Sequence, residues 1–306
     1  MNNPVVTIGV ITYNSAKTVI ETLESIKKQS YLNIELLISD DCSKDNTTAV
    51  CRDWLMKNGD NFVYFAVLES KENKGVPHNC NKVIDNAQGV WIKIIAGDDT
   101  LDKDCIQNNL SFAEKHTEAK IFFSKSRNFK SFTGETVGYR PGDGYILPDA
   151  QEKQFEAFLI KDYVNPTTVF CHKSVYDAVG RYDERYKAME DSPMWFRVFK
   201  RGFKFYYMDI VTVNYRISDT SLSNSKKRGK PNQFWVQSKA DFFNDNVKEE
   251  LICRGYHQYA RLQSINYRLM FALATTNNLL FYCLIKIILK INNYAIILIV
   301  KKHHNG

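Results

Sequence analysis

Residues 91–99 read WIKIIAGDD, an apolar run that ends in a glycine and two adjacent aspartates. A short run rich in β-branched residues, closed by glycine and acidic residues, is typical of a buried strand. Similar runs lie at residues 5–11, 34–39 and 62–68. Each of these three runs is followed by a segment in which apolar residues recur at helical spacing, at residues 16–29, 45–58 and 78–87. This alternation predicts an α/β fold, a mainly parallel sheet flanked by helices.

Polar residues follow each of the four expected strands. Ligands on parallel sheets bind beyond the carboxyl ends of the strands, so these residues are the first candidates for chemistry. They are Thr12, Tyr13 and Asn14 after the first strand, Asp40 and Asp41 after the second, Asn73, Lys74 and Gly75 beyond the third, and Gly97, Asp98 and Asp99 after the fourth.

The rest of the chain is less regular. Residues 120–217 mix expected strands, at 121–123, 167–172, 203–207 and 211–217, with short helices, and residues 218–231 are polar and basic. Helical patterns continue from there to the end. We therefore expect a catalytic domain at residues 1–223 and a helical C-terminal region at residues 224–306.

The charge and cysteine content limit the class of protein. The net charge is +7 over 306 residues, without an arginine-rich reading helix or zinc-finger spacing, which argues against nucleic acid as a partner. A basic C-terminal end beside apolar runs fits an anionic membrane surface better. The seven cysteines are scattered and never form C-x-x-C, and Met1–Pro4 does not resemble a signal peptide. We expect a cytoplasmic protein.

The pair Asp98–Asp99 suggests a metal site. Two adjacent carboxylates repel each other, and a divalent cation such as Mg²⁺ or Mn²⁺ would compensate their charge. The alternative is a solvated turn in which Asp102 and Asp104 cap the next helix.

Two further acidic pairs have similar alternatives. Asp41 could accept hydrogen bonds from a nucleobase or ribose, with Tyr13 stacked on the base, or residues 40–45 could form only a turn and helix cap. Glu190–Asp191 could belong to an active site, or could simply begin a helix, where the macrodipole favours acidic residues.

Taken together, six ordered motifs resemble glycosyltransferase family 2, which has the GT-A fold. The motifs span residues 5 to about 223 and are VITYN (10–14), SDDCSKDNT (39–47), NKGVP (73–77), AQGVWIKIIAGDD (87–99), VGRYDE with MED (179–184 and 189–191), and YRISDTSLS (215–223).

The resemblance implies a role for each matched residue. Tyr13 and Asp41 would hold the base, usually uracil; Asp98 would contact the ribose; and Asp99 would bind the Mn²⁺ or Mg²⁺ that bridges the diphosphate. Asp191 would be the catalytic base, with Glu190 beside it. The remaining donor contacts are assigned to Thr12, Asn14, Asn73, Lys74, Gly75 and Asn81.

Three positions depart from the family pattern. Cys80 stands where relatives often have an arginine, Ala96 where many have an aspartate, and Ser218 where a histidine is common. Lys74 or His78 could replace the missing arginine contact. The Q-x-x-R-W motif of processive members is absent, so transfer of one sugar per encounter is expected.

The resemblance predicts an inverting, non-processive transfer from a nucleotide-diphosphate sugar, usually a UDP-sugar, to a hydroxyl group. With one base and no protein nucleophile opposite, the displacement inverts the anomeric centre. The acceptor that it suggests is a polyprenyl-diphosphate-linked or other glycan of O-antigen or capsule synthesis. The alternatives are an inactive nucleotide-sugar-binding scaffold and a sugar-nucleotide pyrophosphorylase, which needs a glycine-rich loop that residues 12–15 lack.

Residues 278–300 hold long apolar stretches interrupted by Lys286, Lys290 and Asn292–Asn293. A helix here would carry a narrow polar stripe, so we expect it to lie in the headgroup plane of the inner face of the cytoplasmic membrane. A helix packed in the protein or a dimer, or a true span that carries a lysine at a cost of ~3 kcal/mol, are the alternatives. The basic cluster at residues 226–230 is expected to be a solvated loop rather than a lid over the diphosphate.

Overall fold

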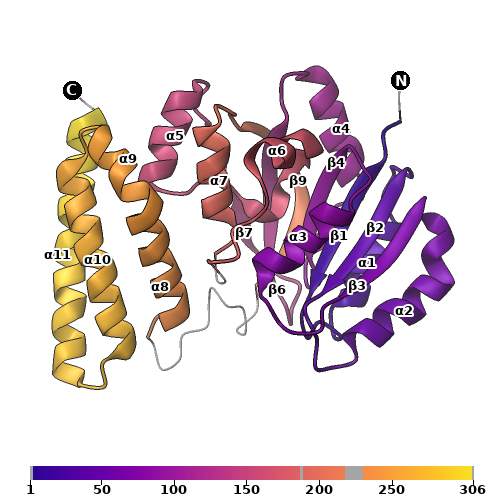
Figure 1. Cartoon of the computed structure of the whole chain (residues 1–306), viewed down its shortest axis with the longest axis horizontal. Coiled ribbons are helices and arrows are strands. Elements are labelled where there is room, and N and C mark those ends of the chain that lie inside the picture. The colour runs from indigo at the N-terminus through magenta and orange to yellow at the C-terminus, as the bar shows by residue number, and fades with distance from the viewer. Residues whose placement is uncertain (1–2, 187–188, 218–229, 305–306) are drawn as a thin grey trace. The chain divides into compact units, whose positions relative to one another are not determined.

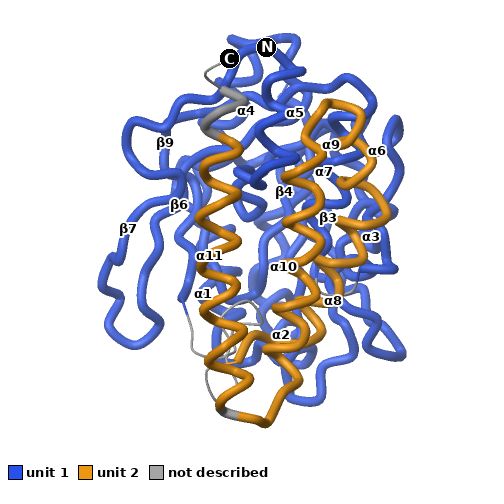
Figure 2. The backbone as a smooth tube through the Cα atoms, turned by 90° about the vertical axis from the view of Figure 1, so that its left-hand side faces the viewer, with its two compact units in different colours: residues 1–218 blue, residues 219–306 orange. Residues whose placement is uncertain are grey.

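A computed structural model describes residues 3–186, 189–217 and 230–304 (Figure 1). The chain forms two compact units, residues 1–218 and 219–306 (Figure 2). The expected boundary after residue 223 and the basic residues 226–229 lie outside the described residues.

The first unit is built on one mixed sheet, whose strand order is β3-β2-β1-β4-β8-β6-β9-β5, with β7 paired to β6. The first four strands are parallel, as expected. Their bounds are β1 Val6–Thr12, β2 Ile34–Asp40, β3 Tyr64–Glu69 and β4 Trp91–Ala96. In register, Thr12 faces Asp40 and Ile11 faces Ala96, so three neighbouring strands end at one edge of the sheet.

Helices cover this half of the sheet. All seven residues of β2 are buried, which requires cover on both faces and explains its continuous apolar run. The helices of this half are α1 Val19–Lys27, α2 Thr47–Asn58 with a short 3₁₀ turn Gly59–Asn61, α3 Val76–Asn86 and α4 Cys105–Lys115. Of these, α3 packs on β1, β2 and β4. It begins beside their carboxyl edge, where Asp41 accepts from the backbone N–H of Gly75.

The second half of the sheet differs from expectation at one strand. The apolar runs at 203–207 and 211–217 belong to a single strand, β9, which begins at Tyr206 and ends at Ile217. It pairs with β6 through register shifts between Ser124 and Ser126, and such bulges let a long strand bend. The other elements are β5 Thr100–Leu101, β6 Ile121–Lys130, β7 Thr136–Arg140, α5 Gln151–Ile160, η2 Pro166–Thr168, β8 Phe170–His172, α6 Lys173–Val179 and α7 Asp191–Lys200.

The second unit is helical in its described residues, as the sequence predicts. Its elements are α8 Gln233–Phe242, a π-helical turn Phe243–Val247, α9 Lys248–Cys253, α10 His257–Thr275 and α11 Leu279–His304. Helices α10 and α11 pack against each other.

Candidate active site

Two non-glycine residues adopt left-handed backbone at the carboxyl edge of the sheet. Asn14, after β1, has φ 53°, and Cys42, after β2, has φ 61°. Such conformations are uncommon and concentrate at functional sites. The Asn14 side chain accepts a hydrogen bond from the backbone N–H of Lys44 at 2.7 Å, which joins the two turns.

Asp41 lies at the start of α3. Its carboxylate is 3% exposed and accepts hydrogen bonds from the backbone N–H groups of Lys74, at 2.9 Å, and Gly75, at 2.8 Å. Gly75 has φ 93°, which a glycine adopts without strain. Asp41 thus fixes the loop before α3, and its remaining lone pairs are the ones left for a base or ribose.

The other expected donor contacts differ in accessibility. Tyr13 is 48% exposed, and Asn73 and Lys74 are also exposed, so a ligand can reach all three side chains. Thr12 is buried, and its hydroxyl donates to Asp40 at 2.8 Å. The Thr12 side chain therefore holds the strand end together, and its assigned contact with the donor stays a prediction.

The two aspartates after β4 occupy unlike environments. Asp99 is 1% exposed; its Oδ1 accepts from the backbone N–H of Arg216 at 2.8 Å, and its Oδ2 is buried without a hydrogen-bond partner among the described residues. Burial, together with the charge of Asp98, raises the pKa of Asp99 to about 8. Asp98 is half-buried, and burial also raises its pKa. Asp98 is therefore the more accessible of the two carboxylates, whereas the family resemblance assigned the metal to Asp99.

Arg216 locks this corner of the site. It is 6% exposed, donates from Nε to the backbone carbonyl of Asp98 at 2.7 Å, and pairs with Glu21. Its guanidinium lies 4.8 Å from the centre of the Phe129 ring. Arg216 belongs to the last quoted motif, but no local pattern predicts its contact with the backbone of Asp98.

The corner suits a hard cation. Asp98 offers carboxylate oxygens, the ligand type that Mg²⁺ and Mn²⁺ prefer, in a place where desolvation disfavours an uncompensated charge. Among the described residues, no group of three or more His, Cys, Asp or Glu side chains could hold a metal ion. A cation here would therefore take most of its ligands from phosphate oxygens and water.

Asn81 has partners within the protein, and its assigned contact with the donor stays a prediction. Its amide donates to the backbone carbonyl of Tyr182 at 3.0 Å and to Glu184 at 3.0 Å, and its oxygen accepts from the backbone N–H of Tyr182 at 2.8 Å. His78 also contacts Glu184, at 3.1 Å. With 7% exposure, Asn81 holds the segment before Glu190 against α3.

Three carboxyl groups gather at the start of α7. Burial and the charge of Asp191 raise the pKa values of both Glu190 and Asp162 to about 7. Asp162 accepts from the Ser192 hydroxyl at 2.6 Å and from the backbone N–H of Val164 at 3.0 Å. Sequence reasoning missed Asp162, because it stands alone after a helix and in no quoted motif.

Helix α3 connects these groups to the nucleotide side. Its first turn is held by Asp41, while burial and the nearby charge of Glu190 raise the pKa of the Cys80 thiol in its middle. The charge of Glu190 therefore acts on Cys80, the position where relatives often have arginine. The acidic groups after β2 and before α7 converge on this one helix.

A mainly parallel sheet with acidic turns along its carboxyl edge is the GT-A type of glycosyltransferase fold, as comparison with solved structures confirms. The first is S. aureus TarS 1–349, with a TM-score of 0.60, 18% identity, and coverage of 87% of this chain and 90% of that one. The second is the mannosyltransferase PcManGT from Pyrobaculum calidifontis, solved with GDP-Man and Mn²⁺, with a TM-score of 0.56, 16% identity, and coverage of 98% and 86%. This chain spans 44% of the longer TarS chain.

Residues 7–179 match the family described as Glycosyl transferase family 2. The chain belongs to this family and is a glycosyltransferase. It is 28% identical over 213 residues to the putative glycosyltransferase EpsE of Bacillus subtilis, covering 67% of this chain and 70% of that protein. It is also 28% identical over 223 residues to the Escherichia coli UDP-Glc:alpha-D-GlcNAc-diphosphoundecaprenol beta-1,3-glucosyltransferase WfaP, covering 72% and 80%.

Proposed function

We propose that this glycosyltransferase moves one sugar, with inversion, from a nucleotide-diphosphate donor to a hydroxyl of a lipid-linked glycan in surface polysaccharide synthesis. The observation that carries the proposal is the convergence on α3: Asp41 holds its first turn, and Asn81 in its middle bonds to Tyr182 and Glu184 of the segment before Glu190. The family match favours transfer over the pyrophosphorylase and scaffold alternatives.

The donor is best supported as a UDP-sugar. Tyr13 is exposed beside the Asn14 turn, where its ring can stack on a base, and Asp41 retains lone pairs for an N–H of the base. The name of WfaP specifies UDP-Glc, and TarS has been solved with UDP-GlcNAc. These are properties of the relatives, and they make uridine the first base to test.

We assign the cation to Asp98 instead of Asp99, because Asp98 is accessible whereas Asp99 is bound to Arg216 and buried. A divalent cation on the diphosphate would stabilise the negative charge that the leaving group gains. Asp99 and Arg216 keep the Asp98 backbone in place.

Asp191 is the proposed base. It begins α7 beside Asp162 and Glu190, two carboxyl groups whose pKa values burial and the charge of Asp191 raise to about 7. Removal of the acceptor proton as the hydroxyl attacks typically contributes ~10²–10⁴-fold. No protein nucleophile is assigned, so each transfer inverts the anomeric carbon.

The acceptor is proposed from relatives. WfaP is named for a diphosphoundecaprenol-linked sugar, and TuaG of Bacillus subtilis, 26% identical over 239 residues, is named as a putative teichuronic acid biosynthesis glycosyltransferase. Lipid-linked glycans are therefore the first acceptors to test.

A panel of sugar nucleotides tests the proposal. Full-length protein is incubated with UDP-, GDP- and dTDP-sugars, with Mn²⁺ or with a chelator, and both hydrolysis and thermal stabilisation are measured. We expect one UDP-sugar to be hydrolysed slowly in a metal-dependent way and to raise the melting temperature. Failure of every nucleotide to bind or react would refute the proposed donor class.

A further inference from the structure

Helix α11 carries an apolar surface that the other described residues leave open. Leu280–Val300 is 21 residues long with a mean hydropathy of 2.0, and only 6% of the apolar window is buried. By length and composition alone, this helix could cross a membrane. The way in which it is held by its neighbour points to a different placement.

A polar contact fixes how α11 is rotated against α10. Asn266 of α10 is 3% exposed; it donates to Asn293 at 2.9 Å and accepts from Asn292 at 3.1 Å. On the same side, Ile285 is buried. Since buried amides are costly to leave unpaired, this contact determines which face of α11 turns outward.

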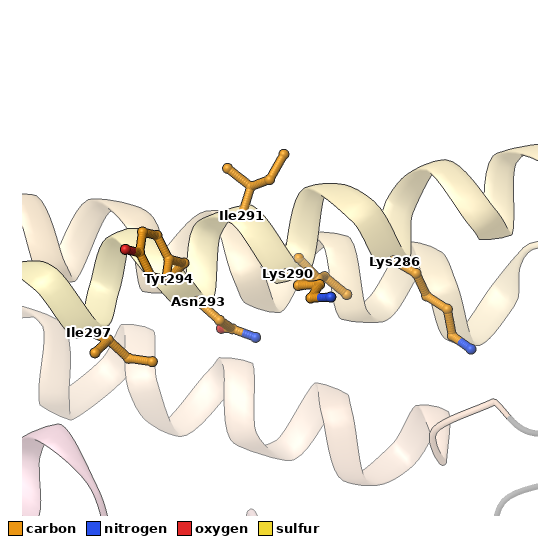
Figure 3. A pocket seen from close by; sticks show the side chains of 7 residues that line it. Lys286, Lys290, Ile291, Asn293, Tyr294 and Ile297 are labelled. Carbon is orange, nitrogen blue, oxygen red and sulfur yellow. The ribbon is translucent and has the colours of Figure 1, made fainter.

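The outward face is an apolar ridge, which recurs every three or four residues. Its members are Leu280, Leu284, Ile287, Ile291, Tyr294 and Leu298, all at least half exposed. Lys286, Lys290, Asn293 and Ile297 line a groove of about 690 Å³ on one flank of this ridge. Figure 3 shows Ile291 pointing away from the side on which Lys286 and Asn293 lie.

The charged side chains of α10 and α11 are all of one sign, positive. Residues 257–304 contain six lysines and arginines and no aspartate or glutamate. An apolar ridge flanked by cations complements an anionic lipid surface, in which acyl chains cover the ridge and phosphates meet the lysines. A second copy of the chain would place like charges together.

A spanning α11 conflicts with its pairing to α10. Helix α10 exposes Arg261 and Arg268. Crossing the bilayer would either break the Asn266 contacts or draw these arginines into the hydrocarbon, where an arginine is strongly disfavoured.

We infer that α11 docks in the plane of an anionic lipid bilayer, with its apolar ridge in the acyl boundary and Lys286 and Lys290 at the lipid phosphates. This gives the proposed function a partner: a membrane surface on the cytoplasmic side where a lipid-linked acceptor resides. The inference rests on the proposed function only for that biological setting, because docking is measured without turnover.

Vesicle flotation of the full-length protein tests the docking. We expect the protein to bind vesicles of phosphatidylcholine with 30% phosphatidylglycerol. Binding should be weaker at high salt, and weaker to vesicles of phosphatidylcholine alone. Exchanging Lys286 and Lys290 together for serine should weaken binding to the anionic vesicles about thirty-fold, at roughly fivefold per lysine. Ile287→Ser with Ile291→Ser should weaken binding to both kinds of vesicle.

The control is Leu32→Ser, which removes a still more exposed apolar side chain from the first unit and should leave flotation unchanged. Circular dichroism and donor binding, retained in every variant, separate lost docking from lost folding. Lack of flotation by the folded wild-type protein, or self-association through the ridge in place of lipid binding, would overturn the inference. Resistance to extraction at pH 11, with the C-terminus protected inside sealed vesicles, would show a span and overturn the in-plane placement.

Discussion

The carboxylate of Asp99 accepts a 2.8 Å hydrogen bond from the backbone amide of Arg216, which joins the end of β4 to β9 across 117 residues of sequence. This contact is the basis for the different roles that we propose for the two adjacent aspartates. Asp99 supports the backbone of the site, and Asp98 is left to meet the ligand.

Substitutions of Asp98 should therefore affect the metal response and donor binding, whereas substitutions of Asp99 should affect stability. Asp98→Asn should abolish the response of hydrolysis to Mn²⁺ and weaken donor binding, while the melting temperature stays near that of the wild type. Asp99→Asn keeps an oxygen for the Arg216 amide and resembles the neutral acid favoured by a pKa of about 8, so turnover should fall less than about tenfold. Asp99→Ala should instead lose roughly 1–3 kcal/mol of stability.

Metal titration of turnover and thermal denaturation of the three variants provide the check. If Asp99→Asn loses the metal response and Asp98→Asn keeps it, the original assignment of the cation to Asp99 is restored.

Asp191→Asn removes the proposed base while preserving the shape of the side chain and its contact to the Ser192 amide. Turnover should fall by ~10²–10⁴-fold, with donor affinity nearly unchanged, because an amide cannot accept the proton. Single-turnover kinetics and donor titration separate the two quantities. Asp177→Asn, an exposed carboxylate on α6, is the matched control, and near-normal turnover of Asp191→Asn would exclude the assigned role.

Asp162 should impose a pH dependence on both stability and activity. Its raised pKa, about 7, means that the folded state binds more protons than the unfolded state between about pH 4 and 7. Stability from this group is therefore lost as the pH rises through that window. Asp162→Asn should gain stability relative to the wild type, by roughly 1–3 kcal/mol between pH 5 and pH 8.

The activity of the wild type should increase, rather than decrease, as the pH rises. Asp162 becomes an anion as the pH rises through about 7, and an anion at this place attracts the proton that leaves the acceptor hydroxyl. The wild-type rate should therefore increase over this range, and Asp162→Asn should flatten the increase. Chemical denaturation and kcat are measured across the pH range, with Asp60→Asn on the exposed surface as the control. A profile for Asp162→Asn that matches the wild type would contradict the coupling.

The sequence predicted the parts of the fold that are encoded locally. The apolar run of β4 and the glycine and acidic residues that end it lie within nine residues, and the prediction matched its bounds, Trp91–Ala96. Asp99 and Asp162 depend on partners far along the chain, so no local pattern distinguishes a buried, bonded carboxylate from a ligand. The two apolar runs that include β9 predict two strands, because a bulge interrupts the period of a strand without ending it.

Asn81 provides the last test, because its expected role and its observed role affect different quantities. If Asn81 contacts the sugar nucleotide, its replacement should raise the Michaelis constant for the sugar nucleotide. The observed contacts to Tyr182 and Glu184 instead hold the segment that leads to Asp191. Asn81→Ala should cost roughly 1–3 kcal/mol of stability, since it leaves the buried Tyr182 amide unpaired.

At temperatures below the melting transition, turnover of Asn81→Ala should be lower than that of the wild type, because Asp191 is less precisely placed. The Michaelis constant for the donor should change little. Asn86→Ala, an exposed asparagine later in α3 that bonds only to Lys82 of its own helix in the described structure, should alter neither quantity. A large rise in the Michaelis constant with unchanged stability would return Asn81 to the donor site and detach it from the Asp191 segment.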